Sequence, residues 1–199
     1  MLQALFDLTV EKGYEAVSIS DIASRANVNR STFYRHYLDK GALLAEYLAA
    51  LQVAVAAVAR QQTDSAAPPA GLLLLLRHIR ERADFYKVML GPQGDAAFVH
   101  RLRQISAKRY RDLFARVDTP APDGPPTELR VAYISQATIG AITWWLSGGR
   151  SWSPEKLAGW LGDLSLAAAG LDPRAAMRRA PLIGRIEPSK GRSDARDEH

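Results

Sequence analysis

The sequence predicts an all-helical protein. Apolar residues recur at helical spacing in the long segments, the alternating pattern typical of strands does not appear, and helix start and stop signals separate the segments. The chain has 199 residues, 47% of them hydrophobic, which is enough to bury a sizeable core. We expect a small N-terminal helical unit that a long helix joins to a larger helical domain.

The first helix is expected to end near Lys12, because Gly13 follows it as a typical helix terminator. Its apolar stripe consists of Leu2, Leu5, Phe6 and Val10. Ser18 and Asp21 have the spacing of a capping box, in which Ser18 caps the free N–H groups and Asp21 reaches back. A short second helix is therefore predicted from Ile19 to Ala26.

The third helix begins only about three residues further on. Asn27 tolerates the left-handed conformation that ends a helix, and Asn29 is placed to cap the next one. In this third helix, Arg30 to Tyr37, the aromatic residues Phe33 and Tyr37 are four apart and anchor one face. Two short helices that meet across such a turn form a helix-turn-helix.

The rest of the chain predicts further helices. Asp39 caps a long one that ends before Thr63. Others are expected at about 70 to 90, ending at Gly91-Pro92, and at 96 to 117, 127 to 147 and 154 to 169. The expected organisation is a helix-turn-helix domain at 1–46, a helical effector-binding and dimerisation domain at 47–180, and a disordered tail at 181–199.

The outward face of the third helix is rich in hydrogen-bonding groups. Its polar residues are Arg30, Ser31, Thr32, Tyr34, Arg35 and His36. A helix of this length fits the DNA major groove, where Arg30 pairs with guanine while Tyr34, His36 and Lys40 are placed for phosphates. A solvated helix face gives the same composition, so the argument depends on the joint pattern of caps, turn and anchor.

The segment ISDIASRANVNRSTFYRHYLDKGALL resembles the DNA-binding part of TetR-family transcriptional regulators. The resemblance depends on Val28, Thr32, Phe33, Tyr34, His36 and Lys40. It implies that Arg30, Ser31 and Thr32 meet bases or nearby phosphates, and that Tyr34, His36 and Lys40 meet phosphates. It also implies a backbone contact to the flanking strand at Ser18 or Ile19. The basic arm usual before the first helix is not in this sequence, and we expect it in an upstream in-frame extension.

The resemblance also implies a homodimer on a double-stranded DNA operator and a small-molecule effector. Val131, Ile134, Thr138, Ile142 and Trp145 form one helical stripe, which matches a stripe of Leu157, Trp160, Leu161 and Leu164. We expect these two stripes to form the dimer interface. A second stripe on the first helix is formed by Tyr133, Ala137, Gly140, Ala141 and Trp144. An ordinary monomeric core is the alternative.

The candidates for effector binding are aromatic, histidine and amide residues in the larger domain. They are His78, Phe85, Tyr86, Met89, His100, Tyr110, Tyr133, Gln136 and Trp144. Each also fits a core position with its hydrogen bond satisfied, and the sequence leaves both interpretations open. The Arg-rich stretch 77–116 fits either an anionic effector or solvated helix faces.

Enzymatic function is not supported, because no phosphate loop, dinucleotide fingerprint, nucleophile elbow or metal-ligand spacing is found, and we expect no cofactor or metal. With no cysteine, no signal peptide and no long apolar span, a cytoplasmic protein without membrane contact is expected. The sequence thus predicts a ligand-responsive repressor. A helical interaction or ligand-binding protein with weakened or lost DNA binding is the alternative.

Overall fold

The computed structural model describes residues 1–62, 68–92, 94–117, 124–149 and 151–170, and within these ranges the chain is helical without a strand. Three short helices come first: α1 (Leu2–Lys12), α2 (Ile19–Arg25) and α3 (Arg30–His36). The longer ones follow as α4 (Lys40–Gln61), α5 (Ala70–Glu81), α6 (Ala83–Leu90), α7 (Ala96–Val117), α8 (Thr127–Trp144), the π-helical turn η1 (Trp145–Gly149) and α9 (Pro154–Ala168). The all-helical fold is confirmed. The tail predicted at 181–199 lies outside the described residues.

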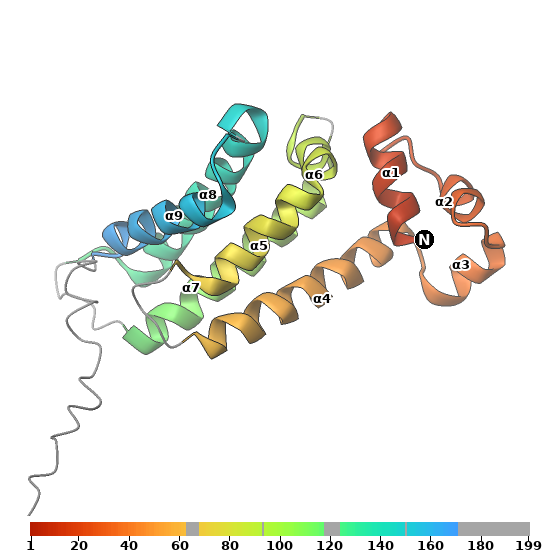
Figure 1. Ribbon diagram of the computed structural model, residues 1–199. Helices are drawn as coiled ribbons and strands as arrows, with labels where there is room; N and C mark the ends of the chain where they lie inside the picture. The colour runs from red at the N-terminus through yellow and green to blue at the C-terminus, as the bar shows by residue number, and fades with distance from the viewer. Residues whose placement is uncertain (63–67, 93, 118–123, 150, 171–199) are drawn as a thin grey trace, which may run out of the picture.

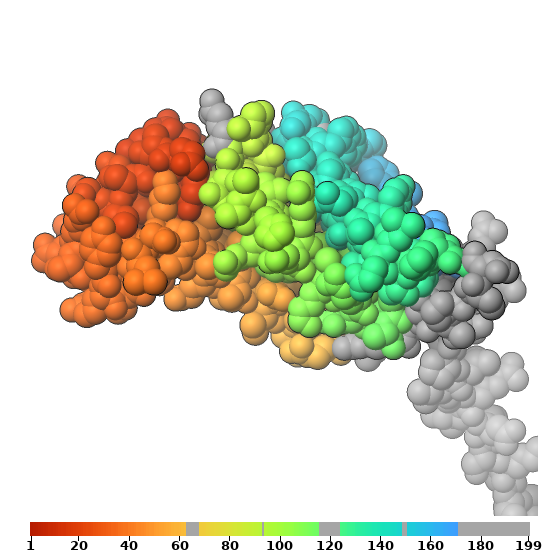
Figure 2. Space-filling view, turned by 180° about the vertical axis from the view of Figure 1, so that it is seen from behind, coloured from red at the N-terminus to blue at the C-terminus, as the bar shows by residue number. Residues whose placement is uncertain are grey.

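The helices α1 to α3 form one end of an elongated molecule, and α8 and α9 lie at the other (Figure 1). Helix α4 leaves the α1–α3 unit and runs the length of the larger domain, where it packs against α5. Seen from behind, the α1–α3 unit meets the larger domain on one side, and α7 and α8 form much of the opposite half (Figure 2). The DNA-facing and dimer-facing ends predicted from the sequence are therefore far apart.

One apolar core connects the two ends. It begins with Phe6 in α1, continues through Leu48 in α4 and Leu76 in α5, and reaches Trp145 in η1. These four side chains are at most 4% exposed. Since burial of each large apolar side chain contributes roughly 1.5–3 kcal/mol, this core determines how the α1–α3 unit sits on the larger domain.

Two helix boundaries differ from those predicted by more than one residue. The helix expected at 70 to 90 is divided at Arg82, whose backbone leaves the helical region at φ −122° and ψ 36°. Its guanidinium lies 5.7 Å from the centre of the Phe6 ring in α1. The helix expected at 127 to 147 ends at Trp144 and continues as η1, where the buried Trp145 indole donates a 3.1 Å hydrogen bond to the carbonyl of Trp152.

By length and composition alone, α4 would be long and apolar enough to cross a membrane. In the structure it packs along α5 and α1, and it buries Leu43, Leu44 and Leu48. Asp39 caps its first turn through a 2.7 Å bond from the Ala42 N–H, as predicted. Helix α4 thus packs against both parts of the protein, and 17% of its most apolar stretch is buried within the chain.

Candidate DNA-binding helix and effector cavity

The turn between α2 and α3 is built by local sequence signals. Ser18 accepts a 3.1 Å hydrogen bond from the Asp21 N–H, and Asp21 accepts a 2.8 Å bond from the Ser18 N–H, which confirms the capping box. Lys12 also binds the Asp21 carboxylate at 2.7 Å, and these partners hold the pKa of Asp21 well below its usual range. Asn27 has a positive φ of 53°, as its place at the end of α2 predicts.

Helix α3 is held by one aromatic anchor. Phe33 is completely buried, and the ring of Tyr37 lies 5.7 Å from it. Asn29 stands at the N-cap but makes no side-chain hydrogen bond there, so the predicted capping by its amide is wrong. The first turn of α3 consequently depends on packing.

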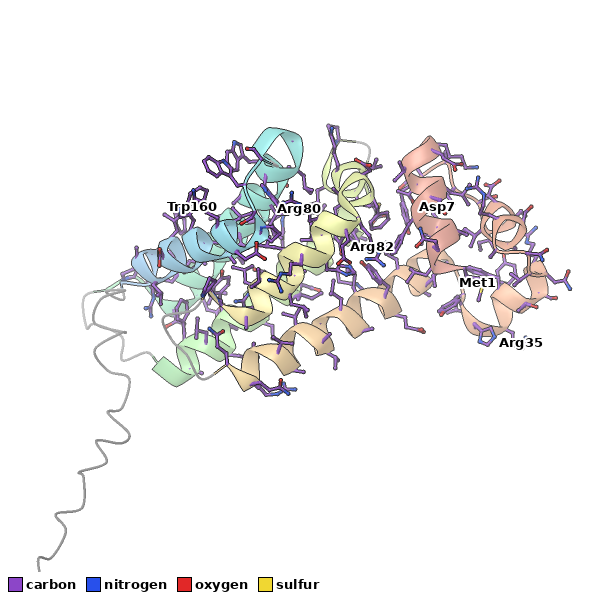
Figure 3. All side chains as sticks on the ribbon, viewed as in Figure 1. Met1, Asp7, Arg35, Arg80, Arg82 and Trp160 are labelled. Carbon is purple, nitrogen blue, oxygen red and sulfur yellow. The ribbon has the colours of Figure 1, made fainter. Side chains whose placement is uncertain are left out.

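The predicted DNA-contacting side chains lie on the outer surface of α3. Arg30, Ser31, Tyr34, Arg35 and His36 are exposed, and Thr32 is half-buried. Arg35 points away from the body of the protein at the tip of this unit (Figure 3). Leu38, just after α3, is 86% exposed and was not identified from the sequence.

Arg30 and Arg35 take part in none of the ion pairs between described residues, whereas Arg25 forms a two-pronged pair with Glu11 at 2.8 Å. The Arg30 guanidinium instead lies 3.3 Å from the Tyr34 hydroxyl and 5.5 Å from the ring centre. A guanidinium held over an aromatic face is partly ordered before it binds. The α3 surface thus offers two uncompensated guanidinium groups.

Lys40, which is predicted to meet a phosphate, has three hydrogen-bond partners within the protein. Its ammonium donates to the carbonyl oxygens of Tyr14 at 2.7 Å, Glu15 at 3.1 Å and Val17 at 3.0 Å. A lysine has three N–H donors, so these bonds use all of them. It also lies 4.4 Å from the centre of the Tyr14 ring, and burial raises the pKa of that phenol to about 12. In this structure Lys40 ties the start of α4 to the α1–α2 loop, and its contact with a phosphate stays a prediction.

Four of the predicted effector-binding residues lie near the boundary between the domains and do not line either cavity described below. The Tyr47 hydroxyl bonds the imidazole of His78 and, at 3.0 Å, the hydroxyl of Tyr86. Burial lowers the pKa of His78 and raises that of Tyr86. Phe85 packs 4.4 Å from the ring of Phe6, and Met89 is fully buried. These residues connect α1 with α4, α5 and α6.

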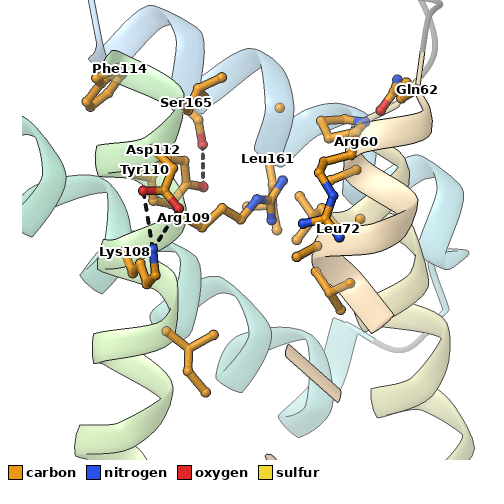
Figure 4. Close-up of a pocket in the computed structure, with 18 of the residues that line it drawn as sticks. Arg60, Gln62, Leu72, Lys108, Arg109, Tyr110, Asp112, Phe114, Leu161 and Ser165 are labelled. Carbon is orange, nitrogen blue, oxygen red and sulfur yellow. Dashed lines mark hydrogen bonds and ion pairs between the residues drawn. The ribbon is translucent and has the colours of Figure 1, made fainter. Parts of the chain in front are cut away.

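One cavity among the described residues has a volume of about 500 Å³ and lies between α4, α5, α7 and α9 (Figure 4). A smaller one of about 60 Å³ lies between α4, α5, α6, α7 and α8. We call them the large and the small cavity. Residues that line both are Gln52, Val55, Leu72, Ile105 and Arg109. A pocket of this size in a mainly apolar wall is typical of small-molecule sites.

Tyr110 is the one predicted effector residue that lines the large cavity. Its hydroxyl bonds Thr138 at 3.1 Å and Ser165 at 3.0 Å, which joins α7 to α8 and α9. His100 is exposed and bonds Gln104 at 2.9 Å. Tyr133, Gln136 and Trp144 are exposed on the outside of α8 and line neither cavity. The face of α8 that carries Tyr133, Gln136 and Trp144 points away from both cavities.

The predicted dimer stripes are also corrected. Val131, Ile134, Thr138, Ile142, Trp145, Leu157 and Leu161 are buried within one chain, so they are not free to contact a second one. Trp160 and Leu164 are 39% and 65% exposed, and Trp160 points outward from α9 (Figure 3). On α8 the exposed apolar face carries Leu129, Tyr133 and Trp144 instead. On α8 the exposed stripe is therefore the second one, which includes Tyr133 and Trp144, and the first stripe is buried.

A helix-turn-helix with an outward polar helix, joined to a helical domain with a ligand-sized cavity, defines a DNA-binding regulator class. Residues 1–47 match the family model for bacterial regulatory proteins of the tetR family, and residues 67–165 match a model for a transcriptional regulator C-terminal region. The chain belongs to the TetR family of transcriptional regulators.

Two curated relatives come from Bacillus subtilis. The chain is 41% identical over 44 residues to the uncharacterized HTH-type transcriptional regulator YdeS, and 26% identical over 164 residues to the uncharacterized regulator YxbF. The first match covers 22% of each chain, and the second covers 78% of this chain and 41% of YxbF. The chain thus spans less than half the length of these relatives.

Solved structures share the fold. The dihydroxyacetone kinase operon activator DhaS superimposes with a TM-score of 0.58 at 25% identity, over 83% of this chain and 91% of that one. A TetR regulator from Streptococcus agalactiae gives 0.63 at 24% identity, over 82% and 89%. Thermus thermophilus FadR, a repressor in complex with lauroyl-CoA, gives 0.51 at 17% identity, over 95% and 96%.

Proposed function

We propose that this regulator is a homodimeric, effector-responsive repressor that binds a pseudo-palindromic operator through α3 of each subunit. One observation supports the DNA contact above the others. Phe33 anchors α3 from one side, while its outer side presents Arg30 and Arg35 without a carboxylate partner among the described residues. Guanidinium groups read guanine edges and bind phosphates. Two copies about one DNA turn apart would supply the needed specificity.

The two domains are joined by contacts that an effector can disturb. Leu48 and Leu51 of α4 line the small cavity, and the neighbouring Tyr47 ring lies 5.0 Å from Phe6 in α1. A molecule that displaces this part of α4 also displaces α1, and with it α3. The effector would then favour a spacing of the two recognition helices that fits the operator poorly.

The test begins with selection of bound fragments from the organism's genome by full-length protein. Arg30→Ala should reduce affinity for the selected operator about tenfold to a hundredfold more than affinity for random duplex DNA, because base discrimination is lost. Arg35→Ala should weaken both about equally. Arg103→Ala, which removes an exposed charge from α7, is the matched control and should change neither.

Equal losses on both DNAs for Arg30→Ala would contradict its role in base recognition. If the wild-type chain fails to bind duplex DNA even at low ionic strength, the DNA-binding proposal is wrong and a helical ligand-binding protein is the better description. A reporter gene behind the selected operator decides the direction of control, since repression predicts higher expression when the regulator is deleted.

A further inference from the structure

Arg109 of α7 lies where the large and small cavities meet. Its side chain extends from α7 toward the α4 wall, where Arg60 lies (Figure 4). Neither arginine takes part in an ion pair between described residues. Arg109 has one weak partner, the ring of Tyr110, at 5.8 Å from its centre.

The charge of the large cavity is therefore not balanced by its described lining. The cations are Arg60, Lys108 and Arg109, and the one carboxylate, Asp112, binds Lys108 at 3.0 Å. Two guanidinium groups remain, and burial lowers the pKa of Arg109. A largely dehydrated cation is unfavourable until an anion binds it.

Other polar groups of the large cavity already have partners. The Tyr110 hydroxyl contacts Thr138 and Ser165, and Gln62 contacts the backbone of Pro68 and Ala70. Few groups are thus left to bind a sugar or another molecule with many hydroxyls. The anion should carry its charge at one end only.

The lining of the small cavity indicates the chemistry of the other end of the effector. Apart from Gln52, Ser106, Arg109 and Thr138, its lining consists of the apolar residues Leu48, Leu51, Val55, Leu72, Leu75, Ile79, Leu90, Leu102, Ile105, Ile139 and Ile142. An apolar group that enters it loses contact with water at no polar cost.

We propose that the effector is an amphipathic anion. Its carboxylate or phosphate head binds Arg109, and its apolar body lies against the apolar wall of the large cavity and reaches into the small cavity with its end. This inference rests on the proposed function, because it assigns the ligand of the same effector site. Arg60 helps to neutralise the head from the α4 wall. The apolar body meets α4 at Leu48 and Leu51, one turn from the contact with α1.

The test uses full-length protein and ten-carbon probes below their micelle concentrations, with binding followed by isothermal titration calorimetry. Decanoate or decyl phosphate should bind at least about tenfold more tightly than decan-1-ol, as expected for one charge-assisted hydrogen bond. Decylammonium should bind more weakly than the alcohol. The tighter of the two anions identifies the head group.

Arg109→Met should remove the preference for the anion over decan-1-ol, because the substitution keeps an unbranched apolar stem but removes the charge. Arg103→Met on the exposed side of α7 is the matched control and should bind like wild type. Ile139→Phe fills the small cavity and should weaken anion and alcohol equally. If that variant does not fold, affinity that rises from hexanoate to decanoate in the wild type tests the same point.

The inference is overturned if no probe binds, if alcohol and anions bind equally, or if Arg109→Met retains the preference. Operator binding is measured separately with the same preparations. An intact operator complex without binding of any probe removes this inference and leaves the DNA-binding proposal standing. Anion binding that leaves operator affinity unchanged supports the ligand class and contradicts the proposed control by effector.

Discussion

Lys40 uses its three N–H donors on the carbonyl groups of Tyr14, Glu15 and Val17. The same residue type at the start of a helix is also suited to a phosphate, which is why the sequence favoured DNA contact. The structural role and the phosphate role predict different effects when Lys40 is replaced. A structural lysine supports the fold without DNA, whereas a phosphate contact matters only in the complex.

We expect Lys40→Met to lower the free energy of unfolding by about 1.5–3 kcal/mol, since two half-buried carbonyls and one exposed carbonyl lose a charged donor. Arg35→Met on α3 should leave stability within about 0.5 kcal/mol of wild type and weaken DNA binding. Urea denaturation and gel-shift titration measure the two quantities. If the Lys40→Met variant has wild-type stability and reduced DNA affinity, the result would support a phosphate contact for Lys40.

Residues whose role is local were predictable, and residues whose role depends on the tertiary structure were not. The positive φ of Asn27 and the Ser18–Asp21 capping box follow from neighbouring residues alone. Arg109 belongs to an arginine-rich stretch in which the sequence cannot separate a cavity residue from exposed ones such as Arg103. Only the packing of α4 against the other helices distinguishes them.

Among the helices, the break at Arg82 is a feature that depends on tertiary contacts and not on the local sequence. No glycine or proline marks the boundary between α5 and α6, so the periodicity of the sequence predicted one continuous helix there. The boundary is set by the surface of α1, where Arg82 meets Phe6. Arg82 lies at the junction of α5 and α6, in the region facing α1 (Figure 3). A contact between distant segments therefore decided this break.

The crossing of α4 and α5 depends on Gly71. A Cβ atom there would lie 2.8 Å from the carbonyl oxygen of Val55 and 3.0 Å from the Cβ of Ala59. Gly71→Ala should force α4 away and cost about 1–3 kcal/mol of stability. At Gly159 an added Cβ meets nothing within 4 Å, so Gly159→Ala should stabilise α9 by about 0.5–1 kcal/mol.

Thermal denaturation of both glycine variants measures these opposite effects. A Gly71→Ala chain as stable as wild type would show that α4 can shift on α5 without loss. In that case the cavity wall is more adaptable than its close helix contact indicates.

For the whole molecule, the exposed apolar face of α8 and α9 is the proposed dimer surface. Large apolar side chains that remain exposed together on one chain are typical of an interaction site. The face includes Leu129, Tyr133, Trp144, Trp160 and Leu164. Periodicity predicted two apolar stripes on α8, but it could not tell which of them the chain's own core would cover.

Leu164→Arg should turn the dimer into a monomer in analytical ultracentrifugation and thereby weaken operator binding, because each monomer presents a single α3. Val53→Arg on α4 is the matched control, since Val53 is 67% exposed and Leu164 is 65% exposed. That variant should remain dimeric. Equal behaviour of the two variants would place the subunit contact elsewhere.

Tyr110 ties α7 to both helices of that proposed surface through Thr138 and Ser165. In the proposed mechanism α7, α8 and α9 therefore stay together, and the effector acts on α4 at the other side of the large cavity. Association of subunits and sensing of a small molecule then become separable properties. Substitutions in α4 can then change which effector the protein binds without changing the proposed dimer surface on α8 and α9.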